Sequence, residues 1–161
     1  MQIRHEVSLH AELDHPNVLP LYGAFFEDSD ISMVMPYAHQ GSVHHLLRQQ
    51  SLPEASLVSA VVMPFLAGLQ HLHSKGYLHR DIKTENVLVD ESGRVMIADF
   101  GLAIDTSVSP AVHRVGTPVY MVRHPHRMHA DGCEVAAFHM LAFLSSSRQR
   151  DRTPYCSNCQ I

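Results

Sequence analysis

Residues 77–101 read YLHRDIKTENVLVDESGRVMIADFG, and the fold is decided in this stretch. Residues 87–89 and 94–98 are β-branched or apolar runs, and the turn-forming tetrapeptide DESG separates them, which predicts a β-hairpin. A hairpin returns its two ends to the same place, so the loops on either side of it should meet. Asp81 lies on the first loop and Asp99 on the second, and we expect their carboxylates to converge. Carboxylates beside amide and ammonium groups suit a site that handles magnesium and phosphate oxygens.

The order of residues in this stretch resembles the catalytic centre of eukaryotic protein kinases. His79-Arg80-Asp81-Ile82-Lys83-Thr84-Glu85-Asn86 is similar to their catalytic loop, and Asp99-Phe100-Gly101 is similar to their metal-binding motif, at the separation that the family uses. The alternative is an ordinary hairpin with charged flanks, which leaves so many matching positions unexplained. The resemblance implies an α+β fold, a partial kinase-like fold with a C-helix and the last small-lobe strands, followed by the first part of the helical large lobe.

The resemblance also implies a role for each matching side chain. Asp81 would accept or orient the proton of the substrate hydroxyl, and Lys83 would neutralise the transferring phosphate. Asn86 and Asp99 would hold magnesium, and Arg80 would meet a phosphorylated residue of the activation loop. The implied cofactors are ATP and Mg²⁺. A lysine at position 83 favours serine/threonine over tyrosine substrates.

The N-terminal third resembles the end of a kinase small lobe. Residues 4–13 have helix-compatible apolar spacing, and Pro16 follows as a helix terminator. In the resemblance, Glu6 takes the position of the glutamate that pairs with the ATP-orienting lysine. Glu12 is the alternative candidate for this role, but we expect it on a solvated face of the helix. Residues 18–25 and 31–35 predict two strands. The nucleotide-binding positions implied by the resemblance are Met35 as gatekeeper, Pro36 and Ala38 in the hinge, and Leu88.

Two helices are predicted after the hinge. Ser42 is a capping residue for a short helix over residues 43–48, and Pro53 suits the first turn of a longer one. Apolar residues keep the helical period along the second helix at Leu57, Val61, Phe65, Leu69 and Leu72. Pro64 interrupts this pattern, so we expect a kink or a restart there.

Further expectations rest on the resemblance alone. The polar segment after Gly101 is placed like an activation loop, with Thr106, Ser107 and Ser109 as candidate phosphorylation sites. Thr117 would hydrogen-bond the catalytic aspartate. The implied hydrophobic spine consists of His79, Phe100, Leu21 and His10, and His10 stands where the family has an apolar side chain.

The resemblance ends after Met121. It divides the chain into a partial small lobe and hinge (1–39), a partial large lobe through the activation segment (40–121), and a divergent tail (122–161) that we expect to be disordered. The glycine-rich loop, the ATP-orienting lysine and the Ala-Pro-Glu motif of the family do not occur in these 161 residues, so we expect negligible phosphotransfer by them alone. The alternative function is a non-catalytic, kinase-like binding or decoy module. A metal-binding adaptor using the histidines and terminal cysteines is a third hypothesis.

Composition narrows the class of protein. The chain has 161 residues, a net charge of −4 and 45% hydrophobic residues, with no basic excess suited to nucleic acid or an anionic membrane. The kinase resemblance implies a protein substrate or a kinase partner. The apolar stretch 57–68 is too short to span a bilayer, and three cysteines indicate a reducing, cytoplasmic compartment. His15-Pro16-Asn17 and the Met-Pro-Tyr hinge resemble the sterile-twenty-like group, near the oxidative-stress-responsive and proline-alanine-rich kinases.

Overall fold

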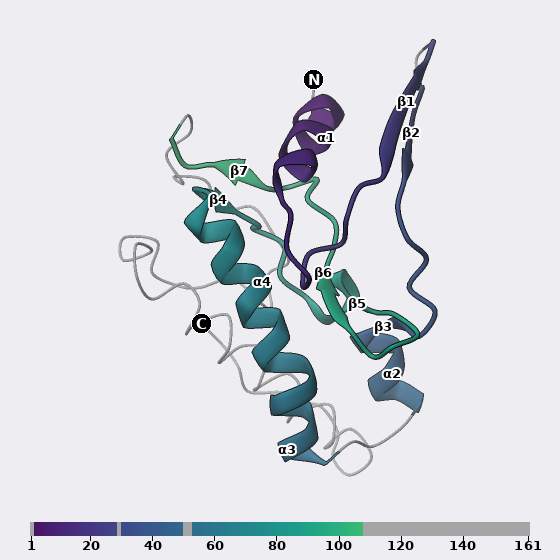
Figure 1. Cartoon of the computed structure of the whole chain (residues 1–161), viewed down its shortest axis with the longest axis vertical. Coiled ribbons are helices and arrows are strands. Elements are labelled where there is room, and N and C mark those ends of the chain that lie inside the picture. The colour runs from purple at the N-terminus through teal and green to yellow at the C-terminus, as the bar shows by residue number, and fades with distance from the viewer. Residues whose placement is uncertain (1, 29, 50–52, 108–161) are drawn as a thin grey trace, which may run out of the picture.

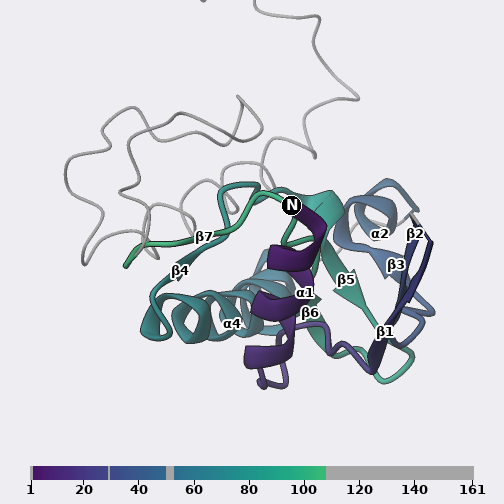
Figure 2. The same cartoon turned by 90° about the horizontal axis from the view of Figure 1, so that it is seen from above.

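The computed structural model of this chain describes residues 2–28, 30–49 and 53–107. Helices and small antiparallel sheets are mixed, and Figure 1 shows their arrangement, which confirms the predicted α+β class. From above, α1 lies between α4 and the hairpin of β1 and β2 (Figure 2). In chain order the elements are α1 (Gln2–Glu12), β1 (Gly23–Glu27), β2 (Asp30–Val34), β3 (Gly41–Ser42), α2 (Val43–Gln49), α3 (Glu54–Leu57), η1 (Val58–Val62), α4 (Met63–Ser74), β4 (Tyr77–Leu78), η2 (Thr84–Asn86), β5 (Val87–Val89), β6 (Val95–Ile97) and β7 (Ile104–Asp105).

The hairpin predicted from residues 87–98 is formed by β5 and β6. Val87 lies opposite Ile97 and Val89 opposite Val95, so the two strands pair in register. The turn is closed by Asp90, whose Oδ1 accepts hydrogen bonds from the backbone N–H groups of residues 92 (2.9 Å) and 94 (3.0 Å). Gly93 has a φ of 84°, a conformation that other residues rarely adopt. Strand β3 pairs with β5 and completes a three-stranded sheet.

Helix α4 forms the core with this sheet. The five apolar positions predicted to share one helix face, residues 57, 61, 65, 69 and 72, are all buried, as predicted. At Gly68 the helix touches the loop after α1, because a Cβ there would lie 2.5 Å from the backbone oxygen of Asn17. That oxygen accepts a hydrogen bond from the Ile97 N–H (2.9 Å), and the Asn17 side chain donates one to the Val95 carbonyl (2.8 Å). One loop therefore joins α4 to the strand that leads to Asp99.

Pro64 produces a wide helical turn. The segment η1 is π-helical, and the N–H of Met63 bonds to the carbonyl of Val58, five residues earlier. Proline lacks an N–H and its ring clashes with a carbonyl in an ordinary α-turn, which explains a local widening. Helix α4 then starts at Met63 with the proline in its first turn. The predicted restart is therefore present, and it takes the form of a π-turn within a continuous helical stretch.

This helical stretch is longer than the apolar run in the sequence. Residues Ala55–Ser74 are long and apolar enough to cross a membrane by length and composition. One such helix is a weak indicator, because core helices pass the same test, and this stretch contributes Leu57, Phe65 and Leu69 to the buried core.

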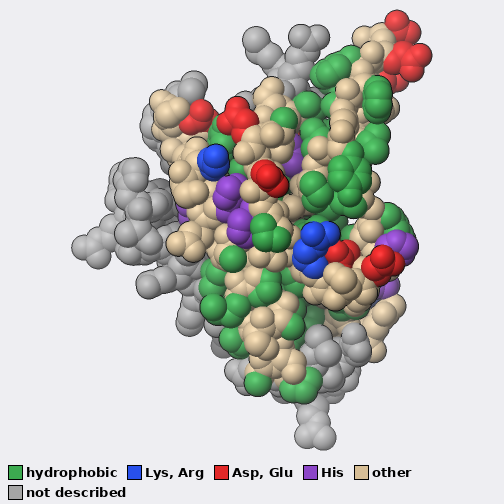
Figure 3. All heavy atoms as spheres, viewed as in Figure 1, with side chains coloured by type: hydrophobic (Ala, Val, Ile, Leu, Met, Phe, Trp, Pro, Cys, Tyr) green, Lys and Arg blue, Asp and Glu red, His purple; other side chains and the backbone are tan. Residues whose placement is uncertain are grey.

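The hairpin of β1 and β2 differs from its prediction. Its first strand begins at Gly23, whereas residues 18–25 were predicted to form it. Val18 makes only an isolated bridge to Ile97, and Pro20, which has no N–H to donate, interrupts the expected strand. Side chains of the finished hairpin are exposed on both faces, with Phe25 64% and Phe26 57% accessible. Figure 3 shows hydrophobic side chains along the hairpin and acidic ones at its tip.

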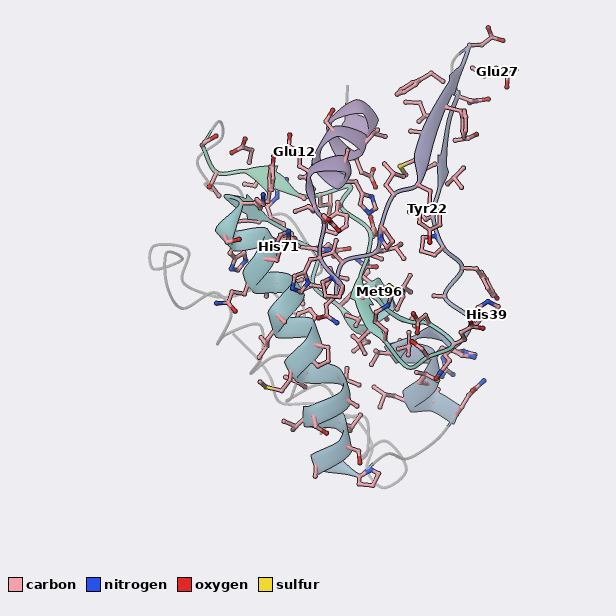
Figure 4. All side chains as sticks on the ribbon, in the orientation of Figure 1. Glu12, Tyr22, Glu27, His39, His71 and Met96 are labelled. Atoms are coloured by element: carbon pink, nitrogen blue, oxygen red, sulfur yellow. The ribbon has the colours of Figure 1, made fainter. Side chains whose placement is uncertain are left out.

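Glu12 joins α1 to a second small sheet. Strands β4 and β7 pair antiparallel beside the end of α4, and Tyr77 lies at the start of β4. Its hydroxyl donates a 2.7 Å hydrogen bond to Glu12 Oε2, and this bond, together with burial, raises the pKa of Tyr77 to about 12. Glu12 points from α1 toward these strands (Figure 4). It is exposed, as predicted for a solvated residue, yet it also anchors the helix.

Candidate active site

Two loops flank the hairpin, and each contains a non-glycine residue with a left-handed backbone. Arg80 has a φ of 66° and Asp99 a φ of 67°. Aspartate tolerates this conformation better than arginine does, and such outliers concentrate at functional sites. The Arg80 Nε donates a 2.6 Å hydrogen bond to the carbonyl of Leu102. This bond ties the loop before the hairpin to the loop after it.

His79 makes a second connection between the loops. Its Nε2 lies 3.1 Å from the Ala98 carbonyl, and its Nδ1 accepts a hydrogen bond from the Asp81 N–H at 3.3 Å. Because a carbonyl only accepts, Nε2 carries the hydrogen and the ring is neutral. Complete burial lowers the pKa of His79, which favours the same neutral form.

Asp81 is the centre of a compact polar group. Only 6% of it is exposed, and its Oδ2 accepts from Lys83 Nζ (2.5 Å) and from the Asn86 side-chain amide (3.1 Å). The same amide donates to the Asp81 backbone carbonyl at 3.0 Å, which fixes the turn η2 against the loop. The hydrogen bond to Asp81 is the main cause that raises the pKa of Lys83. The lysine is therefore charged, and it neutralises the buried carboxylate.

Asp99 approaches the same group from the other loop. Its side chain is exposed, and its Oδ1 accepts a 3.4 Å hydrogen bond from the Gly101 N–H. The charge of Asp99 contributes to raising the pKa of Lys83, and the charges of both Asp81 and Asp99 act on the pKa of His79. The hairpin thus brings the two carboxylates into one electrostatic neighbourhood.

Glu6 reaches this neighbourhood from α1. A Cβ placed on Gly101 would lie 3.4 Å from Asp99 Oδ1 and 3.5 Å from Glu6 Oε2, so both carboxylates flank the glycine. Burial raises the pKa of Glu6, and the negative charge of Asp99 raises it further. Within the described part of the chain, Glu6 forms no ion pair with a lysine or arginine. The position of Glu6 beside Asp99 and Gly101 is a finding of the structure, and its expected pairing with a lysine stays a prediction.

The predicted nucleotide-binding residues border a small apolar cluster. Leu19, Met96 and Ala98 are buried, and Met35 and Leu88 pack against them. Met96 points from β6 into this part of the molecule (Figure 4). Pro36 and Ala38 follow Met35 and are half-buried. Sequence reasoning did not single out Leu19 and Met96, although both are apolar residues within the segments 18–25 and 94–98 that were predicted to be strands.

The start of the predicted activation segment is held by local hydrogen bonds. Thr106 donates to the Gly76 carbonyl through its Oγ1 (2.8 Å) and its backbone N–H (2.9 Å). Ser107 bonds through its N–H and hydroxyl to Asp105 Oδ1. The predicted sites Ser109 and Thr117, and the predicted tail 122–161, lie outside the described residues.

The donor atoms of the site fit a hard divalent cation. The Asn86 amide nitrogen is used by Asp81, which leaves its Oδ1 as an acceptor, and the exposed Asp99 adds carboxylate oxygen. Magnesium prefers one or two such protein oxygens, with water and phosphate completing its shell. Among the described residues, no three His, Cys, Asp or Glu side chains form a group that could hold a metal ion.

Comparisons with known proteins identify a family for this chain. A family model described as "Protein kinase domain" matches residues 1–128. The chain is 35% identical over 121 residues to Mitogen-activated protein kinase kinase kinase 3 of Arabidopsis thaliana and 38% identical over 125 residues to Serine/threonine-protein kinase PLK4 of Drosophila willistoni, in each case over 74% of its length. PLK4 of Xenopus laevis is 33% identical over 150 residues, 85% of this chain. The chain spans 20% of the first relative and 16% of each of the other two.

Proposed function

This chain belongs to the protein kinase family, and from that premise we propose that it is part of a serine/threonine kinase that transfers the γ-phosphoryl group of ATP to protein hydroxyls. The observation that carries the proposal is the bonded group of Asp81, Lys83 and Asn86, with Asp99 beside it. The family generally uses ATP and Mg²⁺ and acts on protein substrates.

The geometry supports a division of labour between the two carboxylates. Asp81 is buried and held by two donors, so its carboxylate is positioned to orient a substrate hydroxyl and to receive its proton. Lys83 already neutralises Asp81 and would share its charge with the transferring phosphate. Asp99 is exposed and, with Asn86, would hold Mg²⁺, whose charge would offset that of the phosphate oxygens.

The proposed binding of ATP is supported by the apolar cluster of Leu19, Met96 and Ala98. Met35 and Leu88 pack on one side of it, and Pro36 and Ala38 continue the chain past it. The flat aromatic faces of adenine suit such a surface, and backbone groups of the hinge would hydrogen-bond its polar edge. Thr106 and Ser107 are exposed and remain proposed phosphorylation sites.

Metal binding by the 161-residue chain tests the proposal directly. Paramagnetic Mn²⁺, used in place of Mg²⁺ and added with ATP, should broaden the backbone signals of Asn86 and Gly101 first. Asp99→Asn should remove this broadening, whereas Asp90→Asn, which changes a carboxylate in the hairpin turn, should keep it.

Two other outcomes would change the interpretation. Equal broadening in wild type and Asp99→Asn would contradict the assigned metal site. Absence of Mn²⁺–ATP binding together with capture of a kinase partner would favour a non-catalytic binding or decoy module.

Two short sequence motifs support an assignment to one group within the kinase family. We propose the sterile-twenty-like group, supported by His15-Pro16-Asn17 and by the Met35-Pro36-Tyr37 hinge. None of the three relatives above has a name from that group, so a tree built on complete kinase domains is the appropriate test. A cytoplasmic location is likewise proposed, and fluorescent tagging of the full protein tests it.

A further inference from the structure

The ring of Phe100 contacts two imidazoles. His10 on α1 meets it edge-on with ring centroids 4.8 Å apart, and His79 lies tilted against it at 5.2 Å. All three side chains are buried, and no more than 3% of any of them is exposed. Both nitrogens of His79 are engaged by the backbone. His10 has a different environment.

Only one nitrogen of His10 is satisfied. Its Nε2 is hydrogen-bonded to the backbone carbonyl of Leu19, and because that oxygen can only accept, Nε2 carries the hydrogen. Nδ1 is buried and has no hydrogen-bonding partner in the described structure. Buried polar atoms are nearly always paired, so an unpaired one in a close-packed position calls for an explanation. A leucine could occupy the same space without this cost.

The surroundings of His10 do not accommodate a positive charge. Glu6 lies one turn earlier on α1, Asp99 precedes Phe100 in the sequence, and His79 packs on the Phe100 ring. Within the described residues His10 forms an ion pair with neither carboxylate. Burial lowers the pKa of His10, and the hydrogen bond to the Leu19 carbonyl only partly opposes this effect. The imidazole is therefore neutral at pH 7.

The contact of His10 with Phe100 lies in the spine that the kinase resemblance implies, and we propose that it is held only while the imidazole is neutral and that protonation of His10 releases it. A proton on Nδ1 adds a buried donor and a charge at an atom that faces no acceptor. Separation of α1 from Phe100 relieves both, because water can then reach the ring. The metal-binding loop is thereby coupled to pH. The effect of this pH coupling on catalysis rests on the proposed function, whereas the His10–Phe100 contact itself does not.

The sign of the effect follows from the lowered pKa. The folded chain binds this proton less readily than the unfolded chain, in which the histidine has its ordinary pKa of 6.5. The contribution of His10 to stability is therefore fully present above pH 6.5 and is lost as the pH falls through the lowered value. His79 adds acid sensitivity of the same sign, so a His10 variant should remove part of the pH dependence and leave the rest.

The test follows the imidazole and the Phe100 ring by NMR in the full 161-residue chain without nucleotide. Wild type should show the Nε2–H tautomer of His10 at neutral pH, and its protonation should coincide with loss of the His10–Phe100 contacts. His10→Gln keeps an N–H for the Leu19 carbonyl but cannot titrate there, so Phe100 should stay in place in acid. The matched control is His39→Gln, which removes an exposed imidazole.

Thermal unfolding supplies an independent measurement. Between about pH 7.5 and 5.5, where histidines change charge, the fall in Tm should be clearly smaller in His10→Gln and His10→Leu than in wild type and His39→Gln. The proposal is overturned by a protonated His10 that keeps its contact with Phe100. Equal pH dependence of Tm in His10→Gln and His39→Gln overturns it as well. Failure to bind ATP would contradict the proposed function and leave these results unaffected.

Discussion

Substitution of Gly68 by alanine tests how the core positions the site. In an unobstructed helix, glycine to alanine stabilises by about 0.5–1 kcal/mol, because alanine loses less backbone entropy. Here the added Cβ would lie 2.5 Å from the Asn17 backbone oxygen and 3.1 Å from Ile97 Cδ1. The oxygen cannot move freely, since it accepts the hydrogen bond from the Ile97 N–H. The steric cost should therefore exceed the gain in helix propensity.

The expected change in the free energy of unfolding is the steric cost minus the gain in helix propensity. Overpacking a close-packed site costs about 1–3 kcal/mol, and a backbone obstacle places Gly68→Ala in the upper part of that range. After subtracting the propensity gain, we expect a net loss of about 1–2 kcal/mol in the free energy of unfolding. In a chain of 161 residues, that loss corresponds to a fall in Tm of about 2–8 °C.

Two measurements on Gly68→Ala distinguish this reasoning from a general loss of stability. Urea denaturation gives the free-energy change, and amide hydrogen exchange reports on the Ile97 N–H, which should exchange faster when the Asn17 carbonyl is displaced. Gly23→Ala is the matched control, because its Cβ meets its nearest neighbour at 4.0 Å. An unchanged or higher stability for Gly68→Ala, with an unaltered Ile97 exchange rate, would refute the proposed contact.

Two further predictions concern single polar contacts. Asp90 is held by the N–H groups and side chains of its turn, which lower its pKa to about 2, so its stabilisation is present above the ordinary value of 3.8 and lost as the pH falls through about 2. Asp90→Asn should remove the part of the fall in Tm that occurs between pH 3.8 and about 2. A pH–Tm profile that is unchanged in this variant would contradict the stabilising role of Asp90. Tyr77→Phe removes the hydrogen bond to Glu12 and should cost about 0.5–1.5 kcal/mol in urea denaturation. Tyr22→Phe, on a side chain that is 69% exposed, should cost nothing measurable, and equal effects of both changes would count against an anchoring role.

Local patterns predicted the hairpin and the core face because each depends on residues close in sequence. The turn chemistry at Asp90 and Gly93 determines the register of β5 and β6, and helical periodicity identified the buried side of α4. The predicted convergence of Asp81 and Asp99 follows from that hairpin.

Features that depend on distant contacts were not predictable in this way. The bond from Glu12 to Tyr77 joins residues 65 positions apart, and no local pattern marks it. The apolar run from residue 18 predicts a strand that starts too early, because Pro20 has no N–H for pairing and β1 begins only at Gly23. The pairing of His10 with the Leu19 carbonyl requires the folded position of α1, although an imidazole at an apolar position was a visible signal.

The π-turn at η1 has a consequence for the phase of the central helix. Neighbouring residues of an α-helix lie about 100° apart, and within this wider turn Val61 and Val62 are both buried, at 6% and 2% exposure. The wider turn contains one extra residue, so the segments before and after it can be aligned independently on the sheet. A sequence one residue shorter at this place, with Pro64 replaced, could keep the same buried stripe as an uninterrupted α-helix. Within the described helical stretch 54–74, we therefore expect the deletion of one residue to be tolerated best at this turn.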